Sequence, residues 1–257
     1  RHAQCPTINI TLIALVVVAV VLGGCALFSR GHLALIFLAA GLFTALAALS
    51  VGINAEWLAA MDASVETWFG MHRSPRWQVD EADIFRFVGQ PVHVVSAAVV
   101  CGTLLSLRAR SAIPAVLVVG GVAVGVVVEQ TLKAMIGRTS TAVAELQDHP
   151  PLAFEHSFPS GHVTGAAALL GMIAVCLGAG RSRAAKTALA VLVVAGVLFV
   201  AFTAVYARAH TFSDVIGGMI LGGAIVTLGA AVLGVNNSGR SRESAGAVRG
   251  HGPGVEL

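Results

Sequence analysis

Seven apolar runs, each long enough to cross a lipid bilayer as a helix of about 20 residues, constrain what this chain can fold into. They lie near residues 8–28, 32–53, 90–107, 112–134, 161–180, 187–207 and 212–234. Of the 257 residues, 56% are hydrophobic and 11% are charged, and a water-soluble domain of this size lacks the polar surface to cover them. The sequence therefore predicts an all-α integral membrane protein, a polytopic bundle of transmembrane helices.

The first run, residues 8–28, has two interpretations. An apolar stretch near an N-terminus can be a signal peptide, but this one is longer than the usual signal core and leads directly into the second run. We expect a retained span, so that residues 1–31 form this span and a short turn. Residues 32–234 then form the main membrane domain, and the Gly-, Ser- and Arg-rich segment 235–257 is predicted to be a disordered tail.

Lysine and arginine are distributed unequally between the two sides of the membrane. The parity of the spans places the connections 29–31, 108–111 and 181–186 on one side, together with the tail, and these segments are rich in basic residues. The positive-inside rule makes that side cytoplasmic. The sequence has no basic block interleaved with aromatic residues, so we expect no nucleic-acid partner.

One connection on the other side, residues 54–89, contains an amphipathic pattern. Apolar residues recur there at steps of three and four, at Trp57, Leu58, Met61, Val65, Trp68 and Phe69. This spacing predicts a helix over about 55–71 with one apolar stripe, lying on the membrane surface or packed on the bundle. Neither arrangement is expected to affect the chemistry of the protein.

A few ionisable residues lie near the ends of the spans, where charge is costly and usually functional. They are Glu129, Lys133, His162, Arg208, His210 and Asp214. Parity places all of them on the extracytoplasmic side. We therefore expect three clusters, distant in the sequence, to meet in one layer.

The middle cluster is HSFPSGHVTG, residues 156–165. Pro159 ends a loop, Ser160 can cap a helix, and Gly161 leaves room for close backbone approach. The helix that follows would present amide groups that bind an anion. Alternatively, Ser160 only caps the span and His162 anchors it at the membrane interface.

The two flanking clusters add cations and a second histidine. His210 and Asp214 are four residues apart, so in a helix they share a face, and the carboxylate can orient the imidazole as a base or nucleophile. A structural hydrogen bond is the commoner explanation of such a pair. Lys133 and Arg138 can hold phosphate oxygens, with Glu129 as an ion-pair partner, or can anchor the chain at the interface.

No metal site, disulfide or other cofactor is predicted from the sequence. The four cysteines, Cys5, Cys25, Cys101 and Cys176, have no paired spacing. The three clusters instead supply what metal-free phosphoryl transfer requires: cations and amides for the oxygens, a nucleophile, and an acid for the leaving group.

The order of the motifs resembles the type 2 phosphatidic acid phosphatase superfamily of membrane lipid phosphatases. The resemblance covers about 32–234, and a usual family core of six spans makes 8–28 an addition. It implies that His210 attacks phosphorus, Asp214 orients His210, and His162 protonates the leaving oxygen. The residues implied to hold the phosphate are Lys133, Ser160 and Gly161.

Two arginines of the family pattern are missing from this chain. The pattern expects arginine where the sequence has Ser140, and Ser-Arg where it has Thr203 and Ala204. Arg138 lies two residues before Ser140, and Arg208 lies four residues after Ala204, one turn along the same face of a helix. Their long side chains are therefore candidates to supply the missing guanidinium groups.

Three functions fit these residues. The first is a phosphatase of a lipid phosphate or polyprenyl diphosphate in a bacterial plasma membrane, acting at the extracytoplasmic face through a phosphohistidine. The second is a phosphotransferase to a sugar or lipid acceptor, and the third is a non-catalytic protein that binds lipid phosphates. The retention of both histidines with Asp214 and Lys133 favours catalysis.

Overall fold

The computed structural model describes residues 10–74, 84, 87–138 and 156–249, with side chains described up to residue 234. The elements of this part are helices: α1 (Ile10–Phe28), α2 (His32–Gly52), α3 (Glu56–His72), α5 (Pro91–Ala109), α6 (Ile113–Ile136), α8 (Gly161–Gly178), α9 (Arg183–Tyr206) and α10 (Phe212–Arg249). Seven of them, all except α3, are long and apolar enough to cross a membrane. The predicted all-α transmembrane bundle is confirmed.

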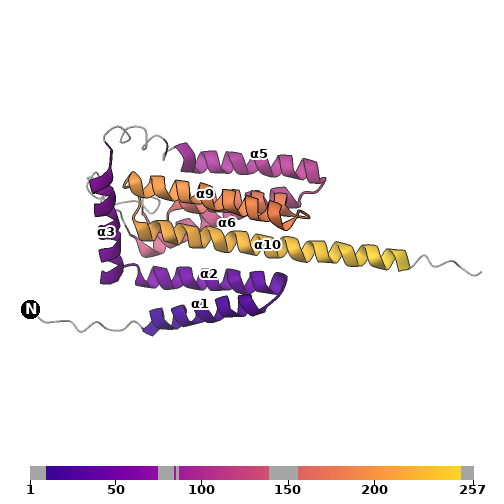
Figure 1. The fold of residues 1–257 in the computed structure, drawn as a ribbon, viewed down its shortest axis with the longest axis horizontal. Coiled ribbons are helices and arrows are strands. Elements are labelled where there is room, and N and C mark those ends of the chain that lie inside the picture. The colour runs from indigo at the N-terminus through magenta and orange to yellow at the C-terminus, as the bar shows by residue number, and fades with distance from the viewer. Residues whose placement is uncertain (1–9, 75–83, 85–86, 139–155, 250–257) are drawn as a thin grey trace, which may run out of the picture.

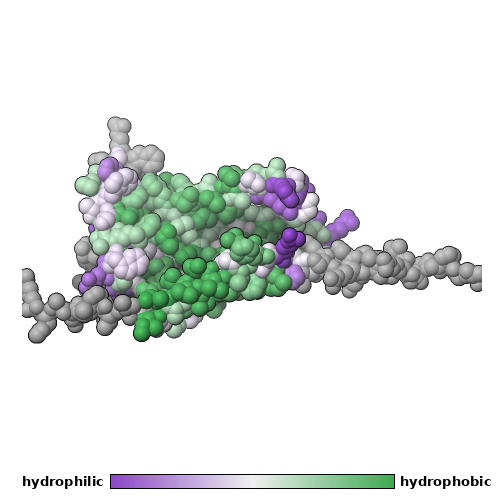
Figure 2. Space-filling model, turned by 60° about the horizontal axis from the view of Figure 1, so that its bottom comes forward, coloured by the Kyte–Doolittle hydropathy of each residue, from purple (hydrophilic) through white to green (hydrophobic). Residues whose placement is uncertain are grey.

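The seven long helices run side by side, and α3 lies across one end of the bundle (Figure 1). On the face that Figure 2 shows, hydrophobic side chains cover the middle of the molecule and hydrophilic ones gather toward its two ends. The amphipathic helix predicted over about 55–71 is therefore present as α3. Its buried residues, Leu58 and Asp62, belong to the face that packs on the bundle.

Helix α10 is the centre of the bundle and contacts α2, α3, α6, α8 and α9. Its glycines allow α8 to approach closely. A Cβ atom added to Gly218 would lie 2.7 Å from the carbonyl oxygen of Ser160, and one added to Gly222 would lie 2.4 Å from the Cβ of Ala167. Close contact between small residues is how membrane helices associate when lipid is as apolar as their side chains. This packing fixes the starts of α8 and α10 beside each other.

Helix α1 is peripheral to this bundle. It packs along α2, where an added Cβ on Gly41 would lie 3.4 Å from the carbonyl oxygen of Ala19, and none of its residues is buried. A helix with no buried residue contributes little to the core. This position suits a span added to a phosphatase-like domain, and its retention stays a prediction.

The C-terminal segment differs from its sequence prediction. Residues 235–257 were predicted to be disordered, but α10 continues as a helix to Arg249, and 250–257 lie outside the described residues. Helix propagation adds one hydrogen bond for each residue fixed once a helix is nucleated, so a long span readily extends into a polar sequence that lacks proline. The prediction of disorder is corrected for 235–249.

The substitution Gly222→Ala is expected to destabilise the protein by about 1–3 kcal/mol, because the new methyl group overpacks the contact with α8. Gly223→Ala is a matched control, since its Cβ would meet the Leu42 side chain at an ordinary 3.7 Å. Thermal unfolding in detergent measures both changes. Equal melting temperatures of the two variants would contradict this account of the packing.

Candidate functional site

The three clusters meet in one layer, at the end of the bundle that α3 covers (Figure 1). Helices α6 and α9 end there, and α8 and α10 begin there. The basic residues of the connections 29–31, 108–111 and 181–186 lie at the other end. The layer contains the sequence-predicted site residues Lys133, Arg138, Ser160, Gly161, His162, Arg208, His210 and Asp214.

A glycine turn brings Arg138 over the site. Helix α6 ends at Ile136, and Gly137 adopts a φ of 63°, a conformation that favours glycine. Its N–H donates to the carbonyl of Lys133 at 3.0 Å. The Arg138 carbonyl then accepts the Ser157 N–H at 2.7 Å. His156 donates from Nδ1 to the Lys133 carbonyl at 2.7 Å. The turn after α6 is thus joined to the segment that leads into α8.

The Arg138 guanidinium connects three parts of the chain. Its Nη1 donates to Ser213 Oγ at 2.6 Å and lies 3.2 Å from Asp214 Oδ1, and its Nη2 lies 2.7 Å from Asp62 Oδ2. Charge-assisted pairs of this kind are strong, and both terminal nitrogens of Arg138 are engaged by protein groups. In this structure Arg138 therefore orders the site from behind Asp214, and its predicted contact with phosphate stays a prediction.

Asp62 was absent from the sequence-predicted site, and α3 was not expected to affect the chemistry. The structure corrects this: Asp62 Oδ1 accepts the Ser213 N–H at 2.8 Å, and Oδ2 accepts the Ser213 hydroxyl at 2.6 Å. Asp62 is buried in the face of α3 that holds Leu58. A carboxylate within an apolar helical stripe was the sequence signal for this role.

His210 and Asp214 are brought together by a helix start. His210 precedes α10, whose first residue is Phe212, so the pair does not share a helical face as predicted. Thr211 and Asp214 form a reciprocal cap: the Thr211 N–H donates to Asp214 Oδ2 at 3.0 Å, and the Asp214 N–H donates to Thr211 Oγ1 at 3.4 Å. This cap fixes the buried carboxylate with its Oδ2 3.8 Å from His210 Nδ1.

The start of α8 presents a buried hydroxyl to the site. Ser160 occupies the N-cap position, but its side chain makes no capping hydrogen bond, which corrects the predicted cap. Its N–H donates to the Asp214 carbonyl at 3.0 Å, which ties α8 to α10. Its Oγ is buried and has no hydrogen-bond partner among the described residues. A buried hydroxyl in this state is suited to receive a ligand oxygen.

Gly161 and His162 complete the junction of α6, α8 and the residues before α5. A Cβ added to Gly161 would lie 2.3 Å from Glu129 Oε1, so only glycine lets this carboxylate approach. Glu129 Oε1 pairs with Lys133 Nζ at 2.8 Å, and both residues are buried. The His162 ring packs on Gly89, where an added Cβ would lie 1.9 Å from it. Its centre lies 6.1 Å from that of the His210 ring, so both imidazoles can reach one small group.

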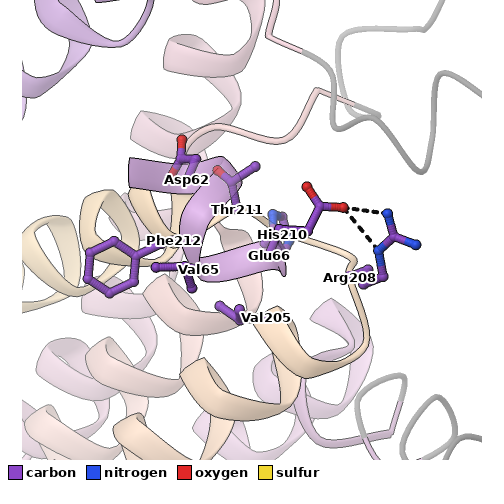
Figure 3. A pocket seen from close by; sticks show the side chains of 8 residues that line it. All are labelled: Asp62, Val65, Glu66, Val205, Arg208, His210, Thr211 and Phe212. Carbon is purple, nitrogen blue, oxygen red and sulfur yellow. Dashed lines mark hydrogen bonds and ion pairs between the residues drawn. The ribbon is translucent and has the colours of Figure 1, made fainter. Parts of the chain in front are cut away.

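Arg208 lies at the mouth of a pocket that His210 also lines (Figure 3). The guanidinium pairs with Glu66 of α3, and Arg208 Nε donates to Glu66 Oε1 at 3.0 Å. Helix α9 ends at Tyr206, and Arg208 has a φ of 56° in the turn that follows, so it does not share a helical face with Ala204 as predicted. Ala204 is fully buried, and its carbonyl accepts the His210 N–H at 3.2 Å.

Each cation of the site therefore has a carboxylate partner: Glu129 for Lys133, Glu66 for Arg208, and both Asp62 and Asp214 for Arg138. In the described ranges, no three or more His, Cys, Asp or Glu residues are grouped to hold a metal ion. Ser140, the position of one missing family arginine, lies outside the described residues.

Comparisons with known proteins bear on the family and the fold. The sequence profile of the PAP2 superfamily matches residues 114–238. The fold is similar to the crystal structure of a transmembrane PAP2-type phosphatidylglycerolphosphate phosphatase from Bacillus subtilis, with a TM-score of 0.62 and 20% identity over 79% of this chain and 96% of that chain. No curated protein sequence matches the chain. The profile and the fold confirm the family resemblance drawn from the three motifs.

The substitution Asp62→Asn is expected to lower the free energy of unfolding by about 3 kcal/mol, because it breaks one side of a buried ion pair. Glu56→Gln, which removes an exposed carboxylate from the same helix, is the matched control. Chemical or thermal unfolding in detergent measures the difference. An Asp62→Asn variant as stable as Glu56→Gln would show that the pair with Arg138 contributes nothing to folding.

Proposed function

We propose that this chain, whose residues 114–238 match the sequence profile of the PAP2 superfamily, is a membrane lipid phosphatase that works through a phosphohistidine. The observation that carries the proposal is the pair of imidazoles at the starts of α8 and α10, 6.1 Å apart, with Asp214 beside His210. Two histidines in one layer supply both a nucleophile and a proton donor.

In the first step, Nε2 of His210 attacks the phosphorus. Asp214 keeps the proton on Nδ1, so that Nε2 carries the reactive lone pair. The 3.8 Å separation of Nδ1 from Asp214 is longer than a hydrogen bond, and catalytic contacts of this kind tighten when the substrate binds. Because Arg138 and Thr211 also bind this carboxylate, its orientation is fixed before the substrate arrives.

The bond from phosphorus to the lipid oxygen then breaks, and protonated His162 donates its proton to that oxygen. Water attacks the phosphohistidine in the second step, and His162 takes the proton that the water loses, which restores the enzyme and releases phosphate. The buried Ser160 hydroxyl, the amides at the start of α8, and Lys133 stabilise the phosphoryl oxygens.

The substrate we propose is a lipid phosphate or polyprenyl diphosphate, because the site lies at the end of membrane-spanning helices. The similar Bacillus subtilis protein is itself a phosphatidylglycerolphosphate phosphatase. We assign the site to the extracytoplasmic face of a bacterial plasma membrane. The basic residues at the opposite end of the bundle support this orientation.

The substitution His210→Ala is expected to reduce phosphate release by on the order of a thousandfold or more, because it removes the nucleophile. The assay uses detergent micelles of polyprenyl diphosphate, phosphatidylglycerol phosphate or phosphatidate, without added metal and with a chelator present. His93→Ala, which removes an exposed histidine on α5, is the control and should retain activity.

The other outcomes identify the alternatives. Appearance of a phosphorylated acceptor without phosphate release would indicate a phosphotransferase. A folded wild-type protein with no turnover on any of these lipids, but with measurable binding to them, would overturn the proposal in favour of a non-catalytic lipid-binding role.

We propose that Arg208 leaves Glu66 to bind the substrate phosphate, since a dianion competes with a carboxylate for a partly exposed guanidinium. Arg208→Ala should then lower kcat/KM about 10- to 100-fold, the range for a charged hydrogen bond of about 1.5–3 kcal/mol. Arg110→Ala is the matched control, because Arg110 also has a positive φ, 48°, and lies at the other end of the bundle.

Glu66→Gln tests the competition between carboxylate and phosphate directly. It should lower KM, because the guanidinium no longer has an ionised partner in the empty site. If Arg208→Ala retains the activity of Arg110→Ala, Arg208 does not replace the missing family arginine.

A further inference from the structure

An apolar groove lies between α3, α9 and α10, on the side of the bundle next to the His210 pocket. All the side chains that line it are apolar, among them Trp68 and Phe69 of α3, Leu198 and Phe202 of α9, and Val215 and Met219 of α10. These residues were not part of any predicted site, except that Trp68 and Phe69 belong to the amphipathic stripe of α3.

The groove is continuous with the pocket of the candidate site. Val65, Val205 and Phe212 line both of them. Figure 3 shows these three side chains around the same opening as His210. A molecule whose polar end lies beside His210 therefore has a direct apolar path away from it.

The path leads from the end of the bundle into the membrane-spanning layer. On α9 it runs from Val205 back to Leu198, and on α10 from Phe212 to Met219. Seven residues along a helix correspond to about 10 Å at a rise of about 1.5 Å per residue. Leu198 and Phe202 are about half exposed, so the groove is open to the side, toward the lipid.

An aromatic cluster fixes one wall of the groove. The ring centre of Phe69 lies 5.8 Å from that of Phe202 and 6.1 Å from that of Tyr206, and Phe202 stacks on Tyr206 at 5.3 Å. Edge and stacked contacts of this kind favour defined ring orientations. This wall joins α3 to α9, so the groove has a preformed shape.

We propose that this groove binds the part of the substrate's hydrocarbon tail that lies next to its phosphate. This inference rests on the proposed phosphatase function. Lipid tails in the bilayer are already in an apolar environment, so the groove gains little from hydrophobic burial. It acts instead by packing, which holds the head group in line with His210 and His162. The groove is thus a specificity site for tail shape.

The test fills the groove and compares substrates of different tail length. Leu198→Trp should lower kcat/KM for dipalmitoyl phosphatidate about tenfold by misplacing the head group, and leave kcat/KM for dibutyryl phosphatidate within about twofold of the wild-type value. The matched control is Leu192→Trp, an exposed leucine of α9 that does not line the groove. A second pair of variants is compared in the same assay: Phe202→Ala, which alters the groove, and Phe199→Ala, its control outside the groove. Both phenylalanines lie on α9 and are 51% exposed.

A binding measurement makes the test independent of turnover. A non-hydrolysable phosphonate analogue of phosphatidate, with a diazirine near the start of its tail, is photolysed with the His210→Ala protein and the adducts are mapped. Labelling of 198–202 or 215–219 that excess unlabelled phosphonate suppresses supports the proposal. Equal labelling by a phosphatidylcholine diazirine would overturn it, because the groove would then hold bulk lipid.

The outcomes separate the groove from the proposed function. Wild-type protein that releases no phosphate from either substrate contradicts the phosphatase proposal, whatever the groove variants do. Wild-type activity with indistinguishable Leu198→Trp and Leu192→Trp profiles, or photolabels outside the groove, overturns the tail site alone.

Discussion

The site depends on one guanidinium group. Arg138 binds Asp62 of α3, Ser213 and Asp214 of α10, and its own carbonyl binds the segment that leads into α8. Without this group, the two buried carboxylates of Asp62 and Asp214 would lose their shared guanidinium partner, which is costly in a medium of low dielectric constant. The cross-helix α3 and the capped start of α10 therefore hold their positions through the Arg138 side chain, and the approach to α8 is held by the backbone of the same residue.

Each cation of this layer has at least one carboxylate partner close by. Lys133 and Glu129 neutralise each other within α6, and Arg208 and Glu66 do so at the pocket mouth. Pairing makes ionised groups tolerable at the end of a membrane bundle. It also means that an incoming phosphate competes with carboxylates for cations. The buried Ser160 hydroxyl has no such competition among the described residues and is suited to make the first contact.

Glycine packing sets the distances on which this chemistry relies. Gly161 admits the Glu129 carboxylate, Gly89 admits the His162 ring, and Gly218 admits the backbone of Ser160. Any other residue at these three positions would place a Cβ atom where the neighbouring group now lies. Glycine has a low helix propensity, so these positions reduce the stability of their helices. The close approach of the functional groups offsets this cost, and the packing of the membrane helices stabilises the bundle.

The sequence by itself determined the seven apolar helices, the amphipathic α3, and the gathering of three polar motifs at one end, because hydropathy, periodicity and parity are local properties of the chain. Only the tertiary structure decided which charged side chains pair with each other. Asp62 and Arg138 are 76 residues apart, and Glu66 and Arg208 are 142 apart, so no spacing rule pairs them. It also decided that Ser160 leaves its hydroxyl for the site, that a cap brings Asp214 to His210, and that α10 continues past the predicted end of its span. These features depend on which atoms compete for each hydrogen bond once the helices are packed.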